Sequence, residues 1–333
     1  MKIACVYHSV DLDGWMSASI VKHWFVSEYG NDHIESRLDV LTKDEVFLYK
    51  GGFDTLKLEY PSIVFVGYNY GQPVPDLSGY DKVIMCDISF PDQIMSNLNE
   101  LYGSNFVWID HHISAMIEQE DTFYKKLLSH VPYNEINGIR DTKFAACELT
   151  WKYFFPNDTV PEIVRLLGRY DCFGHKGTSE ELKVLEFQYG ARQEIFDYQE
   201  AYKWLTICLK EEFREQDLLK AGHFIYGYLC TEAKQSYRNG FELRFDDNHD
   251  GWPRKFICIN KERFNPINFG IDYHADGWDG AACFHRRADG KWAFSLYNDN
   301  DEVDCSVIAK QFGGGGHKGA SGFVVDDINS IIK

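Results

Sequence analysis

Aspartate and histidine side chains follow apolar or helical segments in the N-terminal half of the chain. His8, Asp11 and Asp13 follow the apolar segment at residues 3–7, and Asp87 follows the one at residues 82–86. Asp110, His111 and His112 follow the segment at residues 105–109, and Asp171 lies at the end of a helical pattern. Carboxylates and imidazoles without thiolates suit Mn²⁺ or Mg²⁺, and the histidines favour manganese. Two such cations, about 3.5–4 Å apart, are a common device for phosphoester hydrolysis. We therefore expect two divalent metal ions, Mn²⁺ ahead of Mg²⁺.

Taken singly, these residues have plainer explanations. His8 at a strand end could be structural, and Asp11 and Asp13 could cap the helix that follows them. The joint pattern is more informative, because ligands in open α/β sheets bind beyond the carboxyl ends of the strands. Four separate segments deliver acidic or imidazole groups to that one edge, and such groups repel and desolvate unless cations hold them together.

The elements that would position these residues are short apolar strands alternating with helices. Strands are expected at 3–7, 62–68, 82–86 and 105–109, and helices at 14–27, 91–102, 144–155 and 161–169. This alternation predicts an α/β fold with a mostly parallel sheet and helices on both faces. Residues 194–238 are helical in pattern and read as a linker between a catalytic domain, 1–193, and a smaller α/β domain, 239–333. The second domain has strands expected at 255–260, 280–285 and 292–297 and a helix at 305–311.

Composition narrows the classes of function. The 333 residues carry a net charge of −17. From Ala221 onward there are 13 basic and 16 acidic residues, a net charge of −3, so the first 220 residues carry a net charge of −14. This acidity argues against a broad basic face for a long duplex. Nine cysteines lie at least 22 residues apart, which favours reduced thiols, and no apolar stretch is long enough for a membrane span. We expect a soluble cytoplasmic protein.

Five motifs, in order along residues 3 to about 325, resemble the DHH phosphoesterase superfamily. They are HSVDLDG at 8–14, IMCD at 84–87, IDHH at 109–112, GRYD at 168–171 and FGGGGHKGASGF at 312–323, the last similar to the DHH-associated domain. The two aspartates of the first motif fall three and five residues after its histidine, a spacing that varies in the family. The resemblance implies one metal ion held by His8, Asp11 and Asp87. It implies a second held by Asp13, Asp87, His111 and Asp171, with Asp87 as the bridge. Asp110 would orient the third motif and His112 would touch the scissile phosphate or its leaving oxygen.

The glycine run is the second candidate site. The N–H groups of Gly313, Gly314, Gly315 and Gly316 could face an anion, although a flexible loop is the alternative. In the family this segment, with His317, grips the terminal nucleotide of the substrate. Arg286 could bind phosphate or lie in a solvated turn, and Tyr297 could stack a base or simply pack.

The predicted function is that of a metal-dependent phosphodiesterase, an oligoribonuclease-like 3′-end exonuclease that releases mononucleotides from short RNA. The close alternative is hydrolysis of linear or cyclic signalling dinucleotides, or of 3′-phosphoadenosine 5′-phosphate. Less favoured are a pyrophosphatase and a catalytically silent nucleotide-binding protein. The expected partner is a short oligonucleotide or dinucleotide, with no long duplex and no membrane, and whether the chain forms a homodimer stays open.

Overall fold

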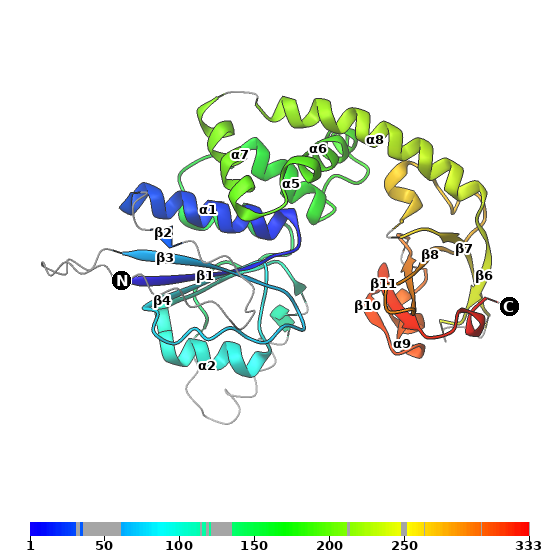
Figure 1. Cartoon of the computed structure of the whole chain (residues 1–333), viewed down its shortest axis with the longest axis horizontal. Coiled ribbons are helices and arrows are strands. Elements are labelled where there is room, and N and C mark those ends of the chain that lie inside the picture. Colours follow the sequence, from blue (N-terminus) through cyan, green and yellow to red (C-terminus); the bar gives the residue numbers. More distant parts are fainter. Residues whose placement is uncertain are drawn as a thin grey trace, which may run out of the picture. The chain divides into compact units, whose positions relative to one another are not determined.

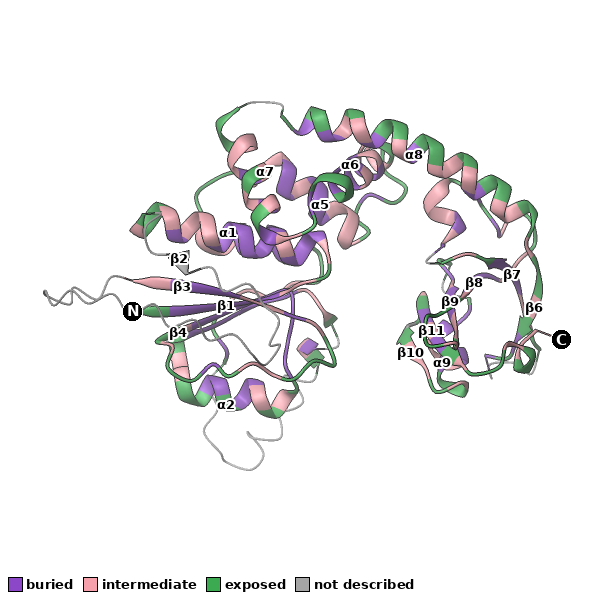
Figure 2. Cartoon of the chain, viewed as in Figure 1, coloured by how far each residue is buried: buried purple, intermediate pink, exposed green. Residues whose placement is uncertain are grey.

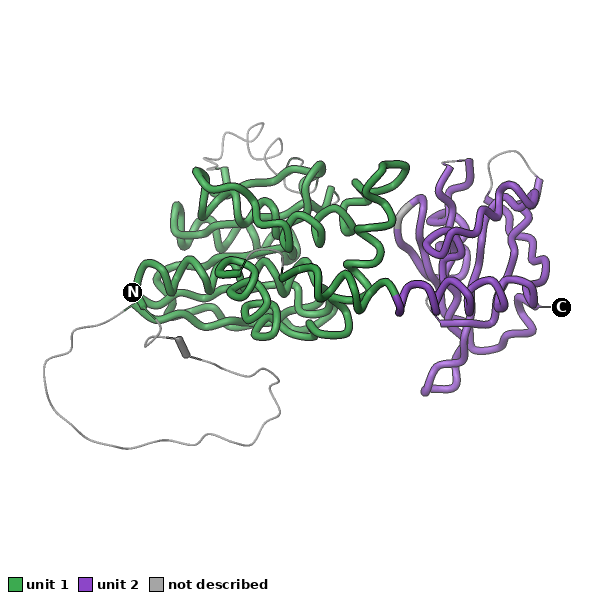
Figure 3. The backbone as a smooth tube through the Cα atoms, turned by 90° about the horizontal axis from the view of Figure 1, so that it is seen from above, with its two compact units in different colours: residues 1–223 green, residues 224–333 purple. Residues whose placement is uncertain are grey.

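The structure is a computed structural model. It describes residues 1–30, 34–35, 61–113, 115–117, 120, 135–211, 214–247, 252–262, 264–300 and 302–332. These residues form two compact units, Met1–His223 and Phe224–Lys333 (Figure 3), and each is described by itself. Among the described residues, no helix is both long and apolar enough to cross a membrane.

A five-stranded sheet is the centre of the first unit (Figure 1). Its order is β2 (Ile34–Glu35), β3 (Ser62–Tyr68), β1 (Lys2–His8), β4 (Lys82–Cys86) and β5 (Phe106–Ile109). Every pairing in this sheet is parallel. The strands are almost continuously apolar because helices cover both of their faces.

Alternate residues of β1 pack against the two helical layers. Ile3 and Cys5 face α1 (Leu12–Tyr29) and α4 (Ala146–Phe154), whereas Ala4 and Val6 face the core under α2 (Asp92–Tyr102). Figure 2 shows the purple, buried strands between these helices. The predicted α/β fold with a parallel sheet covered on both faces is therefore confirmed. The four strands and four helices that were expected there lie within two residues of their expected bounds, whereas β2 and the helix at Glu181–Glu194 were not expected.

Further helices complete the first unit. They are α5 (Glu162–Asp171), α6 (Glu181–Glu194), α7 (Tyr198–Lys210) and the start of α8 (Glu215–Arg238), with a short 3₁₀ turn, η2 (Gly103–Asn105), before β5. The segment read as a linker from the sequence thus holds α7 and α8. In the structure, α7 buries Ala201 and Leu205 in the same core as Met16 and Ile20 of α1. It is therefore part of the first unit's packing as well as a connection.

The second unit is built on a six-stranded sheet. Its order is β10 (Gly315–His317), β11 (Ala320–Val325), β9 (Trp292–Tyr297), β8 (Gly280–Arg286), β7 (Arg254–Asn260) and β6 (Phe241–Phe245). Among the described strands of this sheet, β7 and β8 pair in parallel and the other pairs are antiparallel. The remaining elements are η3 (Pro266–Phe269), α9 (Cys305–Gln311) and η4 (Ile328–Ser330). Because α9 buries Ile308 and Ala309 against Phe256 and Phe294, this unit has its own core, which confirms the expected second α/β domain.

Candidate metal centre

Strand register brings the chemistry-bearing residues of the first unit to one edge. Tyr7 of β1 pairs with Cys86 of β4, and Cys86 pairs with Ile109 of β5. The residues that follow these three positions are His8, Asp87 and Asp110. Because the strands are parallel and in this register, their carboxyl ends present the three side chains next to one another.

The turn after β1 is shaped by Asp11 and Gly14. Asp11 caps α1, since its Oδ1 accepts a hydrogen bond from the Gly14 N–H at 2.9 Å, while Oδ2 lies 2.7 Å from Nδ1 of His8. A Cβ atom on residue 14 would come within 2.8 Å of the His8 Cβ atom. Glycine therefore lets α1 start directly against the end of β1. Asp11 acts as a cap through one oxygen and keeps the other beside the histidine.

Asp13 is held by a helix that is distant in sequence. Its two carboxylate oxygens accept hydrogen bonds from the N–H groups of Ala146, at 2.9 Å, and Cys147, at 2.7 Å. These N–H groups lie in the first turn of α4. The N-cap residue of that helix, Ala145, has no side chain that could accept a hydrogen bond from them. Asp13 thus caps α4, and the favourable end of the helix dipole stabilises a negative charge on it.

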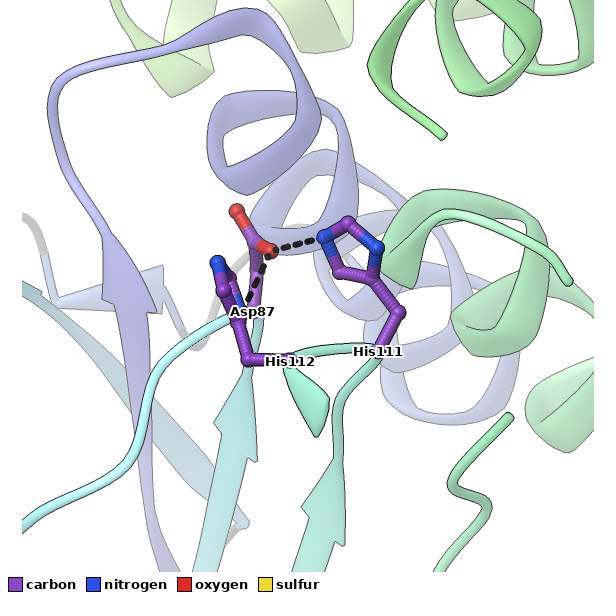
Figure 4. A group of neighbouring side chains, drawn as sticks. All are labelled: Asp87, His111 and His112. Atoms are coloured by element: carbon purple, nitrogen blue, oxygen red, sulfur yellow. Dashed lines mark ion pairs between the residues drawn. The ribbon is translucent and has the colours of Figure 1, made fainter. Parts of the chain in front are cut away.

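Seven aspartate and histidine side chains form three overlapping groups with the geometry of metal ligands. The groups are His8, Asp11 and Asp87; Asp13, His111 and Asp171; and Asp87, His111 and His112. Within each group the ligand atoms lie within 4.8 Å of one another. His111 Nε2 is 3.3 Å from Asp87 Oδ1 and 3.2 Å from Asp171 Oδ2. Figure 4 shows the carboxylate of Asp87 directed at the two histidine rings.

Two buried atoms of this cluster lack a hydrogen bond. His8 Nδ1 lies near Asp11 and Asp87, and Asp87 Oδ1 lies near His111, yet none of these contacts is aligned as a hydrogen bond. Both atoms lie in ion pairs, but neither has an aligned hydrogen bond from the protein. Asp87 also has a left-handed backbone, with φ of 61°, and its N–H donates to the Ile109 carbonyl at 2.9 Å. The donor atoms and their lack of aligned hydrogen bonds fit divalent cations.

The crowding of charged groups shifts the pKa values of the cluster. Burial, together with the neighbouring carboxylates, raises the pKa of Asp13 and of Asp171 to about 7. Burial opposes the charged form of His8 and His111, but the adjacent carboxylates outweigh it and raise the pKa of each imidazole to about 10. Without cations, protons therefore supply the positive charge at this edge, and bound cations would have to displace them.

Asp110 holds His111 and His112 of the third motif in place through hydrogen bonds. It is fully buried, and its Oδ1 accepts hydrogen bonds from the N–H of His111 at 2.7 Å and from the N–H and Nδ1 of His112, at 3.2 and 2.7 Å. Its Oδ2 accepts a hydrogen bond from Trp108 Nε1 at 3.2 Å. With Nδ1 of His112 assigned as the donor to Asp110, Nε2 is the nitrogen left for another group.

Two side chains near the centre were missed in the sequence. Glu148 of α4 is buried, its carboxylate packs against Gly168, and burial raises its pKa. An acidic residue on the inward face of a helical pattern was the signal that could have revealed it. Tyr70 stands in the loop after β3, a strand end that contributes none of the expected metal ligands. An aromatic residue just beyond a strand end was the corresponding signal there.

The glycine segment of the second unit is largely strand. Gly315, Gly316 and His317 pair with β11, and Tyr297 and His317 both pair with Ala320. The N–H groups of Gly313 and Gly314 donate to the carbonyls of Lys310 and Ala309 at the end of α9, so in this conformation they are not open to an anion. The His317 side chain lies outside the described residues.

The structure does not bring Arg286 to the glycine segment. On β8, Ala281 pairs with Tyr297, whereas Arg286 pairs with Trp292, five positions along the strand. Arg286 instead lines an open pocket with Arg287. A contact of Arg286 with the nucleotide expected at Tyr297 and His317 stays a prediction.

Comparisons with known proteins show distant likeness only. No family model matches the chain. An uncharacterized protein of Acanthamoeba polyphaga mimivirus is 26% identical over 336 residues, which cover 98% of this chain and 68% of that protein.

Three solved structures are similar over almost the whole chain at low identity. A pGpG-specific phosphodiesterase, PggH, from Vibrio cholerae has a TM-score of 0.47 at 14% identity, covering 99% of this chain and 94% of its own. An exopolyphosphatase-related protein from Bacteroides fragilis has a TM-score of 0.45 at 13% identity, covering 97% and 86%. The exonuclease RecJ bound to manganese has a TM-score of 0.45 at 12% identity, covering 98% and 86%.

Proposed function

We propose that the chain is a metal-dependent phosphoesterase of the DHH superfamily that hydrolyses phosphodiester bonds in short oligonucleotides or dinucleotides. One observation carries the proposal. Seven aspartate and histidine side chains from four separate segments converge at the carboxyl edge of the sheet, and two buried ligand atoms among them have no hydrogen bond. The order of the motifs along the chain supports the same assignment.

The ligands divide into two sets that share one carboxylate. His8, Asp11 and Asp87 would hold one ion, and Asp13, Asp87, His111 and Asp171 would hold the other. Divalent cations bound here, Mn²⁺ ahead of Mg²⁺, supply an acidified water and positive charge for the phosphoryl oxygens. Asp87 would belong to both sets, because one of its carboxylate oxygens lies 3.5 Å from Nδ1 of His8 and the other lies 3.3 Å from Nε2 of His111.

His112 and Asp110 act together on the substrate side of the centre. The bond from Nδ1 to buried Asp110 fixes the ring, and Asp110 raises the pKa of His112 although burial opposes this. The imidazolium would then offer an N–H from Nε2 to the leaving oxygen of the phosphate. General acid catalysis of this kind contributes about 10²–10⁴-fold to a rate.

The preference for short substrates follows from charge. A chain of net −17, with most of the excess in the catalytic part, repels a long polyanion that lies outside a cation-bearing site. Recognition of the terminal nucleotide falls to Gly315, Gly316, His317 and Tyr297 of the second unit. The release of mononucleotides from the 3′ end of RNA is the leading form of the activity.

Hydrolysis of a substrate panel tests the proposal. The protein is stripped with chelator, reloaded with Mn²⁺ or Mg²⁺, and given labelled RNA and DNA from two to about 24 residues, cyclic dinucleotides and 3′-phosphoadenosine 5′-phosphate. Asp87→Ala, with verified folding, is the inactive control. Release of mononucleotides that declines with length supports the oligonucleotide form, and turnover of another member of the panel reassigns the substrate. If neither metal supports hydrolysis of any substrate, the proposal fails.

A further inference from the structure

An exposed aromatic ring stands beside the candidate metal centre. Tyr70, two residues beyond the end of β3, is 52% exposed, more than most large hydrophobic side chains of the first unit. Its ring centroid lies 6.1 Å from that of His8 and 6.4 Å from that of His112. The ring therefore borders both the first set of ligands and the histidine that faces the substrate.

The position of this ring is fixed at both ends. The Tyr70 N–H donates to Asn69 Oδ1 at 2.8 Å, and the Asn69 N–H donates to Gln72 Oε1 at 2.9 Å, which closes the turn after β3. At the other end, the phenol group is hydrogen-bonded to Ser89, two residues beyond Asp87. An aromatic side chain that is anchored in this way yet open to solvent loses little entropy when a flat ligand covers it.

The flat ligand that fits this place is a nucleobase. Every base has a π-face, and stacking on tyrosine is a sequence-tolerant way to hold single-stranded nucleotides. A base joined through its sugar to a phosphate at the ligand cluster would lie among the side chains next to the cluster, and the Tyr70 ring is one of these. Inorganic polyphosphate and other phosphoesters that carry no base would leave the ring exposed.

We propose that Tyr70 stacks the nucleobase next to the scissile phosphate, so that the centre selects nucleotides over phosphoesters without a base. The proposal rests on the proposed function and assigns to the first unit a recognition element separate from the glycine segment. Tyr70 is thus a substrate-contacting residue, and the hydroxyl group has only to hold the ring in place.

Steady-state kinetics of Tyr70→Leu and Tyr70→Phe test this inference in the Mn²⁺-loaded full chain. The substrates are a diribonucleotide and the same diester in which both bases are replaced by hydrogen. Tyr228→Leu is the matched control, because Tyr228 is also exposed, at 65%, but lies on α8 in the second unit. Manganese content and circular dichroism confirm that each variant is loaded and folded.

The expected result is a change that depends on the base. For Tyr70→Leu, KM for the diribonucleotide should rise about 5- to 150-fold with kcat within about threefold. Activity on the abasic diester should stay the same and Tyr228→Leu should behave like wild type. Tyr70→Phe, which keeps the ring but loses the bond to Ser89, should show a smaller rise in KM for the diribonucleotide than Tyr70→Leu. An equal loss on both substrates for Tyr70→Leu would instead mean that Tyr70 only positions the histidines, and an equal fall in kcat on both substrates for Tyr70→Phe would mean that its hydroxyl acts in the reaction. Either outcome overturns the stacking role while leaving the phosphodiesterase intact, whereas an inactive wild-type protein contradicts the proposed function itself.

Discussion

Gly14 is the position where a single methyl group should separate folding from metal binding. In Gly14→Ala, the new Cβ atom would lie 2.8 Å from the Cβ and carbonyl carbon of His8 and nearer still to its carbonyl oxygen. Carbon atoms in favourable contact are about 3.5–4.0 Å apart, so the start of α1 has to move from β1 by about 1 Å. This movement carries Asp11 and Asp13 away from His8 and Asp87.

The cost can be worked out for both activity and stability. A misplacement of about 1 Å in a reacting geometry lowers a rate by about 10²-fold, and overpacking of this kind costs about 1–3 kcal/mol of stability. We expect kcat/KM to fall by about 100-fold and Mn²⁺ binding to weaken, with the chain still folded at 25 °C. Isothermal titration with Mn²⁺, urea unfolding and hydrolysis of a diribonucleotide measure the three quantities.

Two further glycine variants provide matched controls. A Cβ on Gly227 of α8 meets nothing within 4 Å, so Gly227→Ala should gain about 0.5–1 kcal/mol of stability with unchanged activity. A Cβ on Gly222 would collide with the backbone of Glu186 in α6, so Gly222→Ala should destabilise the helical packing but spare manganese affinity. If Gly14→Ala binds Mn²⁺ and turns over substrate like wild type, the close approach of α1 to β1 does not build the site.

Further substitutions and pH probe the remaining parts of the site. Asp87→Ala should lower activity at least about 10³-fold and release most of the bound metal, measured by elemental analysis, because one carboxylate serves both ligand sets. Retained metal would contradict the assignment of Asp87 to both sets. Asp110→Asn should lower kcat by about 10–100-fold with metal content kept, since His112 loses the partner that orients it; an unchanged kcat would remove that role. Mn²⁺ affinity should rise between pH 6 and 8.5, because a cation must displace protons from Asp13 and Asp171, whose pKa values are raised to about 7; proton release measured by titration in two buffers checks the sign, and pH-independent binding would refute it. His317→Ala should raise KM about 10-fold or more with metal content intact, and loss of metal would show that the segment belongs to the metal site.

Much of the site was predictable because its ligands follow strand ends. Side chains such as His8 and Asp87 could be placed at one edge from local patterns alone, since parallel strands end on the same side of a sheet. The identity of the donors likewise indicated hard divalent cations. Local patterns could not show the separate roles of the two oxygens of one carboxylate. In Asp11, one oxygen caps α1 and the other contacts His8.

The glycine run shows how pairing partners change an interpretation. In isolation, four consecutive glycines are typical of a flexible loop, whose N–H groups could face an anion. In the structure Gly315 and Gly316 form a strand with β11, and the N–H groups of Gly313 and Gly314 end α9. Such hydrogen bonds depend on elements that the run itself does not encode.

By itself, then, the sequence determined the α/β fold class, most of the elements in the first unit and the set of candidate ligands, because each depends on the periodicity and side-chain types of short segments. Tertiary structure decided the contacts between distant segments. Asp13 holds the N-terminus of a helix more than 130 residues away, and Tyr70 is anchored to Ser89 beside the histidines. Only the packing of strands and helices brings such groups together, because the free energy of each contact depends on a partner that no local spacing specifies.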